Sequence, residues 1–171
     1  MAAAEVAAIA TVIIASVSDL STSRIPNVLT FSAAGLAITA HLVAPDGSGG
    51  VFAIVGLLAG LAVFFPLFAL GAMGAGDVKL MAAVGAWIGW KAVLFVALYG
   101  SVAGGVLALF VAVRQQYLKQ ALANIKMLFV FWWVEGVKPL PELTLESTRG
   151  VRLPYALAIA AGLAVTLWQQ R

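Results

Sequence analysis

The sequence contains no cysteine and a single histidine, His41. The lack of cysteine excludes disulfide bonds and thiolate metal sites, and one histidine cannot form an imidazole-rich metal centre. Charged residues are also scarce, at 10% of 171 residues, whereas 63% are hydrophobic. Soluble domains carry about 25% charged residues because their surfaces face water. We therefore expect a membrane protein with a single domain over residues 1–171.

Apolar stretches separated by short polar turns follow one another along the chain. A helix needs about 20 apolar residues to cross a bilayer, and a shorter one can reach the interface where tryptophan or lysine flanks it. We therefore predict an all-α, polytopic membrane helix bundle with about six transmembrane helices. Their expected positions are residues 2–18, 27–43, 51–70, 77–90, 92–113 and 153–170.

The basic residues are distributed unequally between the two sides of these predicted spans. If the N-terminus lies outside, eight of the ten lysines and arginines fall inside, and only Lys91 and Arg171 fall outside. Cytoplasmic loops are enriched in positive charge, so the bias predicts a multi-pass protein of the bacterial cytoplasmic membrane. The net charge of +3 does not indicate nucleic-acid binding, because the basic residues do not cluster with stacking aromatic side chains.

The segment at about 114–152, between the last two predicted spans, is expected on the cytoplasmic side. Apolar residues share one helical face there, and lysines flank this face, which is typical of a helix lying among anionic lipid headgroups. The alternative is a shallow re-entrant insertion, because residues 129–133 are apolar on all sides. The apolar face is formed by Leu118, Leu122, Ile125, Phe129 and Trp132, and the flanking lysines are Lys119 and Lys126.

Two aspartates occupy the edges of predicted spans. Asp19 ends the first span, in SVSDLSTSRIPN, and Asp77 begins the fourth, in GAMGAGDVKL. The predicted orientation places both at the cytoplasmic edge, where water has access. Two carboxyl groups a few ångströms apart do not both ionise, so they hold a proton between them. The ionised member can then activate water while the protonated member polarises a peptide carbonyl. The alternative is that both aspartates are helix caps or boundary charges.

Residues around the aspartates provide further candidates. Gly74 and Gly76 remove side chains beside Asp77, so an extended substrate could lie against the backbone there; close helix packing is the alternative. Lys79 follows Asp77 by two residues and is either a charge that tunes the aspartates or a positive-inside anchor. Asn27 opens the second span and could hydrogen-bond in the site; a structural role at the start of the helix is the alternative. His41, at the outer end of that span, is expected at the interface.

Together these segments resemble those of a known family. GAGDVKLMAAVGAWIG resembles the G-x-G-D-x-K-L segment of the type IV prepilin peptidases, which are GxGD aspartic peptidases. Asp19 followed by RIPN resembles their first catalytic segment, and VRLPYALAIAAGLA resembles their closing helix. The resemblance implies that Asp19 and Asp77 are catalytic and that Gly74 and Gly76 are motif glycines. It also implies an endopeptidase that cuts the leader peptide from prepilin or pseudopilin precursors on the cytoplasmic side, with no metal or organic cofactor.

The sequence departs from the longer members of the family, which carry paired cysteine motifs linked to N-methylation of the new terminus. Because this chain has no cysteine, we do not expect methyltransferase activity. The short form resembles the dedicated peptidases of Flp, or tight-adherence, pilus systems. The alternative function is a small membrane transporter or channel subunit that moves ions by its boundary carboxylates. No carboxylate falls near the middle of a predicted span, which favours the enzyme.

Overall fold

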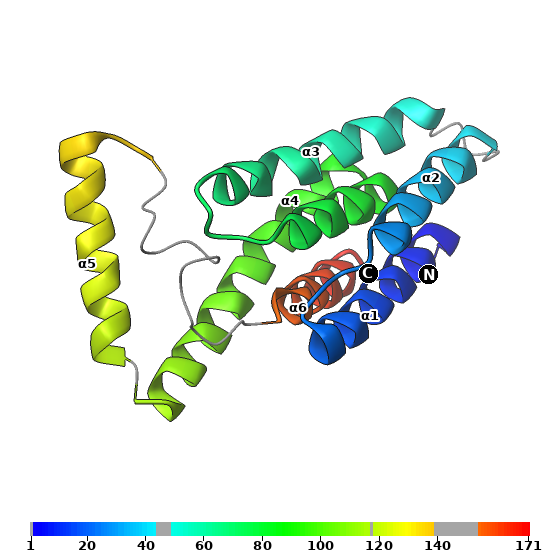
Figure 1. Ribbon diagram of the computed structural model, residues 1–171. Coiled ribbons are helices and arrows are strands. Elements are labelled where there is room, and N and C mark those ends of the chain that lie inside the picture. Colours follow the sequence, from blue (N-terminus) through cyan, green and yellow to red (C-terminus); the bar gives the residue numbers. More distant parts are fainter. Residues whose placement is uncertain (1, 44–48, 117, 139–153) are drawn as a thin grey trace.

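The computed structural model describes residues 2–43, 49–116, 118–138 and 154–171, and these residues form helices joined by short turns, with no strand among them. The prediction of an all-α bundle is confirmed. Figure 1 shows the helices, which are α1 (Ala3–Thr22), α2 (Asn27–Val43), α3 (Gly49–Ala69), α4 (Ala75–Arg114), α5 (Leu118–Glu135) and α6 (Tyr155–Gln169).

Helices α1, α3 and α4 are long and apolar enough to cross a membrane, judged by length and composition. Helices α2 and α6 are also apolar but shorter, with 17 and 15 residues. Large apolar side chains on the outside of the bundle are exposed, such as Val28 at 80% and Trp168 at 77%. Such a surface is unfavourable in water, and it suits a protein embedded in lipid.

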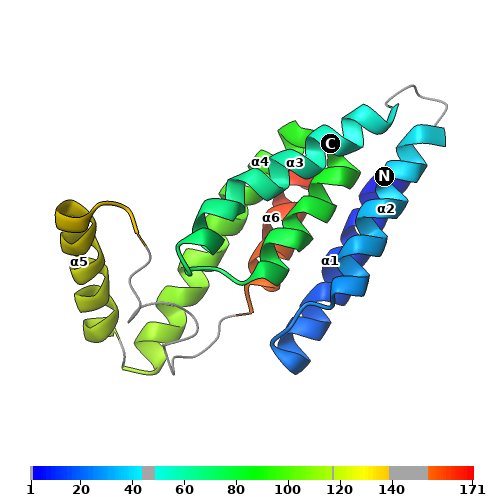
Figure 2. The same cartoon turned by 45° about the horizontal axis from the view of Figure 1, so that its top comes forward.

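Helix α4 is interrupted at Gly89, where the backbone adopts φ 80° and ψ 171°. This combination is accessible essentially to glycine alone, and an added Cβ would collide with the ring of Phe52. The chain reverses direction there, so the two halves of α4 run side by side (Figure 2). Gly89 lies one residue before the end of the predicted span 77–90, so the sequence placed the boundary between the two halves close to the observed break.

His41 at the end of α2 supports this break. Its Nε2 lies 3.1 Å from the carbonyl oxygen of Trp87, and its ring contacts that of Phe52, with centroids 4.9 Å apart. A carbonyl oxygen only accepts hydrogen bonds, so Nε2 carries the proton. Because the helix is broken at Gly89, the Trp87 carbonyl oxygen lies outside the regular helical hydrogen-bond pattern. The His41 imidazole donates a hydrogen bond to it instead. His41 is buried among the helices, at 8% exposure, and its expected position at the membrane interface stays a prediction.

Small residues allow α4 to pack closely on two neighbours. Gly56 of α3 meets Gly85 of α4 backbone to backbone, and an added Cβ at either position would collide with the other. Gly162 of α6 packs in the same way against Gly100 of α4. Close backbone approach through small residues is the usual way in which helices associate in membranes. Helix α4 is therefore the central element, with α3 and α6 fixed against it.

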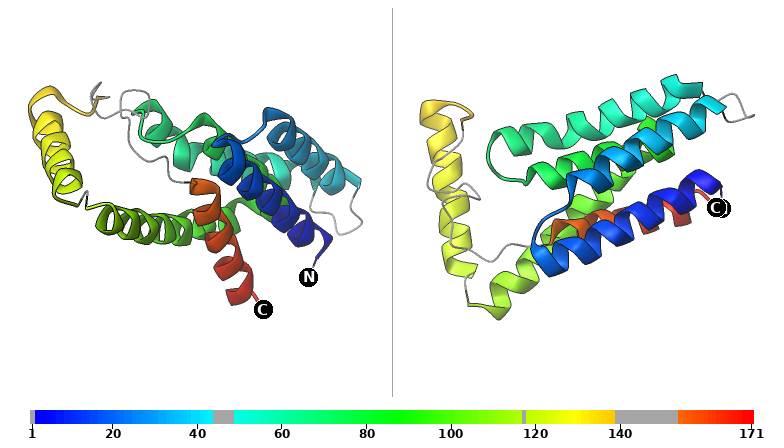
Figure 3. Two further views of the ribbon diagram at one scale, coloured as in Figure 1. Left: turned by 60° about the horizontal axis from the view of Figure 1, so that its bottom comes forward. Right: turned by 45° about the vertical axis from the view of Figure 1, so that its right-hand side comes forward.

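Helix α1 lies between α6 and α2 (Figure 3, left) and contacts both. Helix α5 stands apart from the bundle, beyond the end of α4, and none of its residues is buried (Figures 1 and 3). The segment predicted at about 114–152 thus contains the expected helix over Leu118–Glu135. Residues 139–152 of that segment lie outside the described part of the chain. Its placement in the membrane interface stays a prediction.

Candidate active site

Asp19 lies in the last turn of α1 and is half-buried. The helix ends at Ser23, which adopts the left-handed conformation with φ 52°. The Ser18 hydroxyl donates to the carbonyl oxygen of Arg24 at 3.0 Å, which holds the following turn against the helix end. The backbone N–H of Ala156, in the first turn of α6, donates to Asp19 Oδ2 at 3.4 Å. A carboxylate is favoured at such a helix N-terminus.

Asp77 lies in the first turn of α4, three residues after the N-cap residue Gly74. Its side chain accepts a hydrogen bond from the Gly74 N–H, while its own N–H donates to the Gly74 carbonyl oxygen at 3.2 Å. This is half of a capping box, in which Gly74 is the N-cap residue and Asp77 caps it from within the first turn. A capping role does not exclude chemistry, because one carboxyl oxygen suffices for the cap.

The two aspartates, which are 58 positions apart in the sequence, meet at the same end of the bundle. They are near enough for the charge of Asp19 to act on Asp77. The first turn of α6 connects them, since Ala156 contacts Asp19 and the neighbouring Tyr155 lies within electrostatic reach of Asp77. The chain thus brings the two carboxyl groups within electrostatic reach of each other at one end of the bundle.

The two segments that carry the aspartates also touch each other directly. A Cβ added to Gly76 would lie 3.1 Å from Ile25 Cβ, so the turn after α1 rests against the bare backbone of Gly76. Next to it, Lys79 Nζ donates to Asn27 Oδ1 at 2.8 Å, which ties the start of α2 to α4. The packing alternative for this glycine is therefore supported by a specific neighbour.

Lys79 and Asn27 bond to each other, and in the described part of the chain neither residue forms a hydrogen bond or ion pair with Asp19 or Asp77. The Lys79 ammonium also lies 5.4 Å from the centre of the Phe31 ring, a favourable cation–π arrangement. Within the described ranges no ion pair joins Lys79 to Asp77. The structure thus gives Lys79 and Asn27 a mutual structural contact, and a role of either residue in substrate binding stays a hypothesis.

The turn before Asp77 is shaped by glycine at two positions. Gly71 has φ 73°, and its N–H donates to Phe68 O at 2.9 Å, which ends α3. A Cβ on Gly74 would lie 3.2 Å from Asp77 Oδ2. A side chain there would crowd the carboxyl group, so Gly74 keeps the approach to Asp77 open.

Tyr155 and Ser101 are site neighbours that the sequence reasoning missed. The Tyr155 hydroxyl hydrogen-bonds with the Ser101 side chain, and Ser101 belongs to the second half of α4. Only the reversal at Gly89 brings this half back beside Asp77. The sequence signal was the aromatic residue at the start of the last span, but nothing in it indicated proximity to the aspartates.

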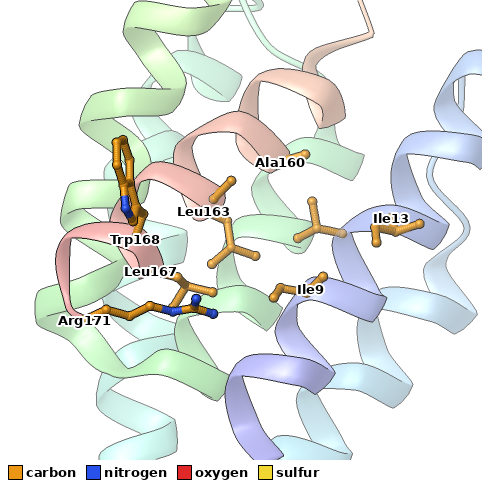
Figure 4. A pocket seen from close by; sticks show the side chains of 9 residues that line it. Ile9, Ile13, Ala160, Leu163, Leu167, Trp168 and Arg171 are labelled. Carbon is orange, nitrogen blue, oxygen red and sulfur yellow. The ribbon is translucent and has the colours of Figure 1, made fainter. Parts of the chain in front are cut away.

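Two apolar grooves flank α1, and neither is lined by an aspartate. The groove between α1 and α6 has a volume of about 430 Å³ and is lined by side chains such as Ile13 and Leu163, with Arg171 at one end (Figure 4). The groove between α1 and α2 has a volume of about 610 Å³. These surfaces suit apolar groups, and they provide no acid or base. No cluster of three potential metal ligands occurs in the ranges that the structure describes.

Comparison with protein families identifies the family of the chain. The type IV leader peptidase family matches residues 6–109, which is more than half of the chain and includes both aspartates. The chain therefore belongs to the type IV leader peptidase family, and its general role is that of a membrane-embedded peptidase acting on prepilins. No curated protein and no solved structure matches the chain.

Proposed function

We propose that this protein is an aspartic endopeptidase that uses Asp19 and Asp77 to cut the leader peptide from prepilin-like precursors. The observation that carries the proposal is the convergence of the two carboxyl groups at one end of the bundle, where the charge of one acts on the other. Family membership supports the peptidase activity, and the electrostatic coupling of the pair supports the aspartic mechanism.

The mechanism follows from one proton held between the two carboxyl groups. The ionised carboxylate removes a proton from water as the water attacks the scissile carbonyl carbon, and the protonated carboxyl donates to the carbonyl oxygen. Collapse of the tetrahedral intermediate breaks the C–N bond, and the leaving amine takes a proton from the pair. No metal or organic cofactor is needed for these steps.

We further propose that the aspartates face the cytoplasm of a bacterial inner membrane. The support is the bias of eight basic residues against two in the sequence. A prepilin would then present its leader to the aspartates from the cytoplasm while its hydrophobic helix stays in lipid beside the bundle. The bare backbone at Gly74, where an added Cβ would meet only the Asp77 carboxyl group, would let the extended cleavage segment approach Asp77.

A Flp-type prepilin is the proposed substrate, and the protein is not expected to methylate the product. The support for both statements is the resemblance to the peptidases of Flp pilus systems and the lack of cysteine in the sequence. Co-expression with a Flp-type prepilin tests them, because mass spectrometry of the product gives its N-terminus and shows whether a methyl group is present. Cleavage at the leader junction with an unmodified amine is the expected result. An uncut prepilin, or a methylated product, would contradict the respective part of the proposal.

A further inference from the structure

The groove between α1 and α6 combines hydrophobic walls with a single cation. Ile9 and Ile13 of α1 face Leu163 and Leu167 of α6 across it, and the Arg171 side chain lies at one end (Figure 4). Among the described residues that line the groove, Arg171 alone is charged. A ligand that matches this lining has a long apolar part and one anionic group at its end.

The cation lies at the end of the bundle opposite the aspartates. Helix α6 begins beside Asp19, to which the Ala156 N–H donates, and it runs to Gln169, two residues before Arg171. One turn before Arg171, Trp168 lines the groove and is 77% exposed. Exposed tryptophans of membrane proteins lie at the level of the lipid headgroups. The Arg171 guanidinium is therefore at the depth of lipid phosphates.

The size of the groove fits one hydrocarbon chain. From Ala160 to Arg171 it extends about 16 Å along α6, which is close to half of the roughly 30 Å hydrocarbon core of a bilayer. Its volume of about 430 Å³ then gives a mean cross-section of about 26 Å² over the 16 Å length. A helix about 10 Å in diameter has a cross-section of about 80 Å², so a membrane-spanning helix does not fit into the groove.

We propose that this groove binds a phospholipid of the leaflet opposite the aspartates. One acyl chain lies between α1 and α6, and the phosphate pairs with the Arg171 guanidinium. The planar guanidinium donates two parallel hydrogen bonds to a phosphate, which makes arginine a strong phosphate ligand. This inference does not depend on the proposed function.

Arg171 is available to such a phosphate. In the described part of the chain no carboxylate forms an ion pair with it, and Glu5, the acidic residue at the same end of α1, accepts a hydrogen bond from the Ala2 N–H at 3.2 Å. The groove between α1 and α2 provides a contrast, because no charged side chain lines it among the described residues. That groove has no group that would select a phosphate.

Two variants change the proposed site, and each has a matched control. Arg171→Gln removes the cation, whereas Lys91→Gln removes a cation at the same end of the bundle that lies over the Trp90 ring, at 5.6 Å, outside the groove. Ala164→Trp places a large side chain in the groove. Ala161→Trp places the same side chain on an exposed position of α6 that does not line it.

Native mass spectrometry of the full chain in detergent measures the binding of phosphatidylglycerol, of diacylglycerol with the same chains, and of inorganic phosphate. We expect one phosphatidylglycerol on the wild-type protein, bound about tenfold more tightly than diacylglycerol, as for a charge-assisted hydrogen bond. Arg171→Gln should weaken phosphatidylglycerol binding about tenfold and leave diacylglycerol binding unchanged. Ala164→Trp should abolish binding of both lipids. Lys91→Gln and Ala161→Trp should stay within about twofold of the wild type.

The inference is overturned if Arg171→Gln binds phosphatidylglycerol as the wild type does, or if Lys91→Gln loses as much affinity. Equal affinity for diacylglycerol and phosphatidylglycerol would show a groove that takes any apolar chain, and displacement of the lipid by inorganic phosphate would show a site for a free anion; both contradict the proposal. A lipid-free dimer, or displacement of the lipid by an added prepilin, would assign the groove to a second copy of the chain or to the substrate. Should Ala164→Trp not fold, Arg171→Gln decides.

Discussion

The contact between α3 and α4 gives a prediction whose size follows from the structure. A Cβ added at Gly85 would lie 2.8 Å from the Gly56 carbonyl carbon and closer to its oxygen, whereas ordinary contacts begin at 3.4 Å. The obstacle is backbone and cannot rotate aside, so Gly85→Ala forces the two helices apart. Overpacking typically costs about 1–3 kcal/mol, and the gain in helix propensity from glycine to alanine offsets about 1 kcal/mol. We expect a net loss of up to about 2 kcal/mol of unfolding free energy.

The matched control is Gly105→Ala in the same helix, where an added Cβ would meet nothing within 4 Å. There the propensity term acts alone, and we expect a stabilisation of up to about 1 kcal/mol. Thermal unfolding of both variants in the same detergent measures the difference. The packing argument is refuted if Gly85→Ala is as stable as Gly105→Ala.

Three further predictions concern contacts away from the aspartates. Asn27→Ala and Lys79→Ala should each cost about 0.5–1.5 kcal/mol of unfolding free energy. The double variant should cost no more than Lys79→Ala alone, because both substitutions remove the same hydrogen bond and only Lys79 also contacts Phe31. Additive losses would disprove a mutual contact. His41→Leu should lower the free energy of unfolding by about 1–3 kcal/mol, because it leaves the Trp87 carbonyl oxygen without its donor. The kcat of the folded fraction should be unchanged. A loss of kcat would place His41 in the site. If α5 lies in the interface, Trp133 fluorescence should be quenched by brominated lipids, measured as the difference from the Trp133→Phe variant; no quenching would exclude that placement.

The arrangement of helices was largely predictable because it depends on apolar stretches and their interruptions. Polar residues around Asp19 and Asp77 ended one predicted span and began another, and the basic residues placed both at one edge of the membrane. The structure brings these two side chains to the same end of the bundle. Their roles in catalysis stay a prediction, which family membership supports only in general terms.

Long-range contacts were not predictable from such patterns. The sequence placed His41 by its distance along a helix, but the break at Gly89 creates a polar carbonyl in the interior for which the imidazole is a partner. Likewise, Lys79 is two positions from Asp77 in the sequence, yet its side chain reaches Asn27. Tyr155 was not predicted as a neighbour of the site, because its contacts depend on the reversal of α4. No local sequence pattern indicates the geometry of that reversal.

The account depends on Asp19 and Asp77 acting as one unit, and a cleavage assay with Asp19→Asn, Asp77→Asn and the double variant tests this directly. Each variant would be purified in a folded state, verified by thermal unfolding, and its kcat on a prepilin compared with that of the wild type. Each single substitution should lower kcat by about 100-fold to 10,000-fold. The double variant should be no slower than the slower single variant, because groups that share one proton fail together. A single variant that retains wild-type kcat, or losses that multiply in the double variant, would contradict the account.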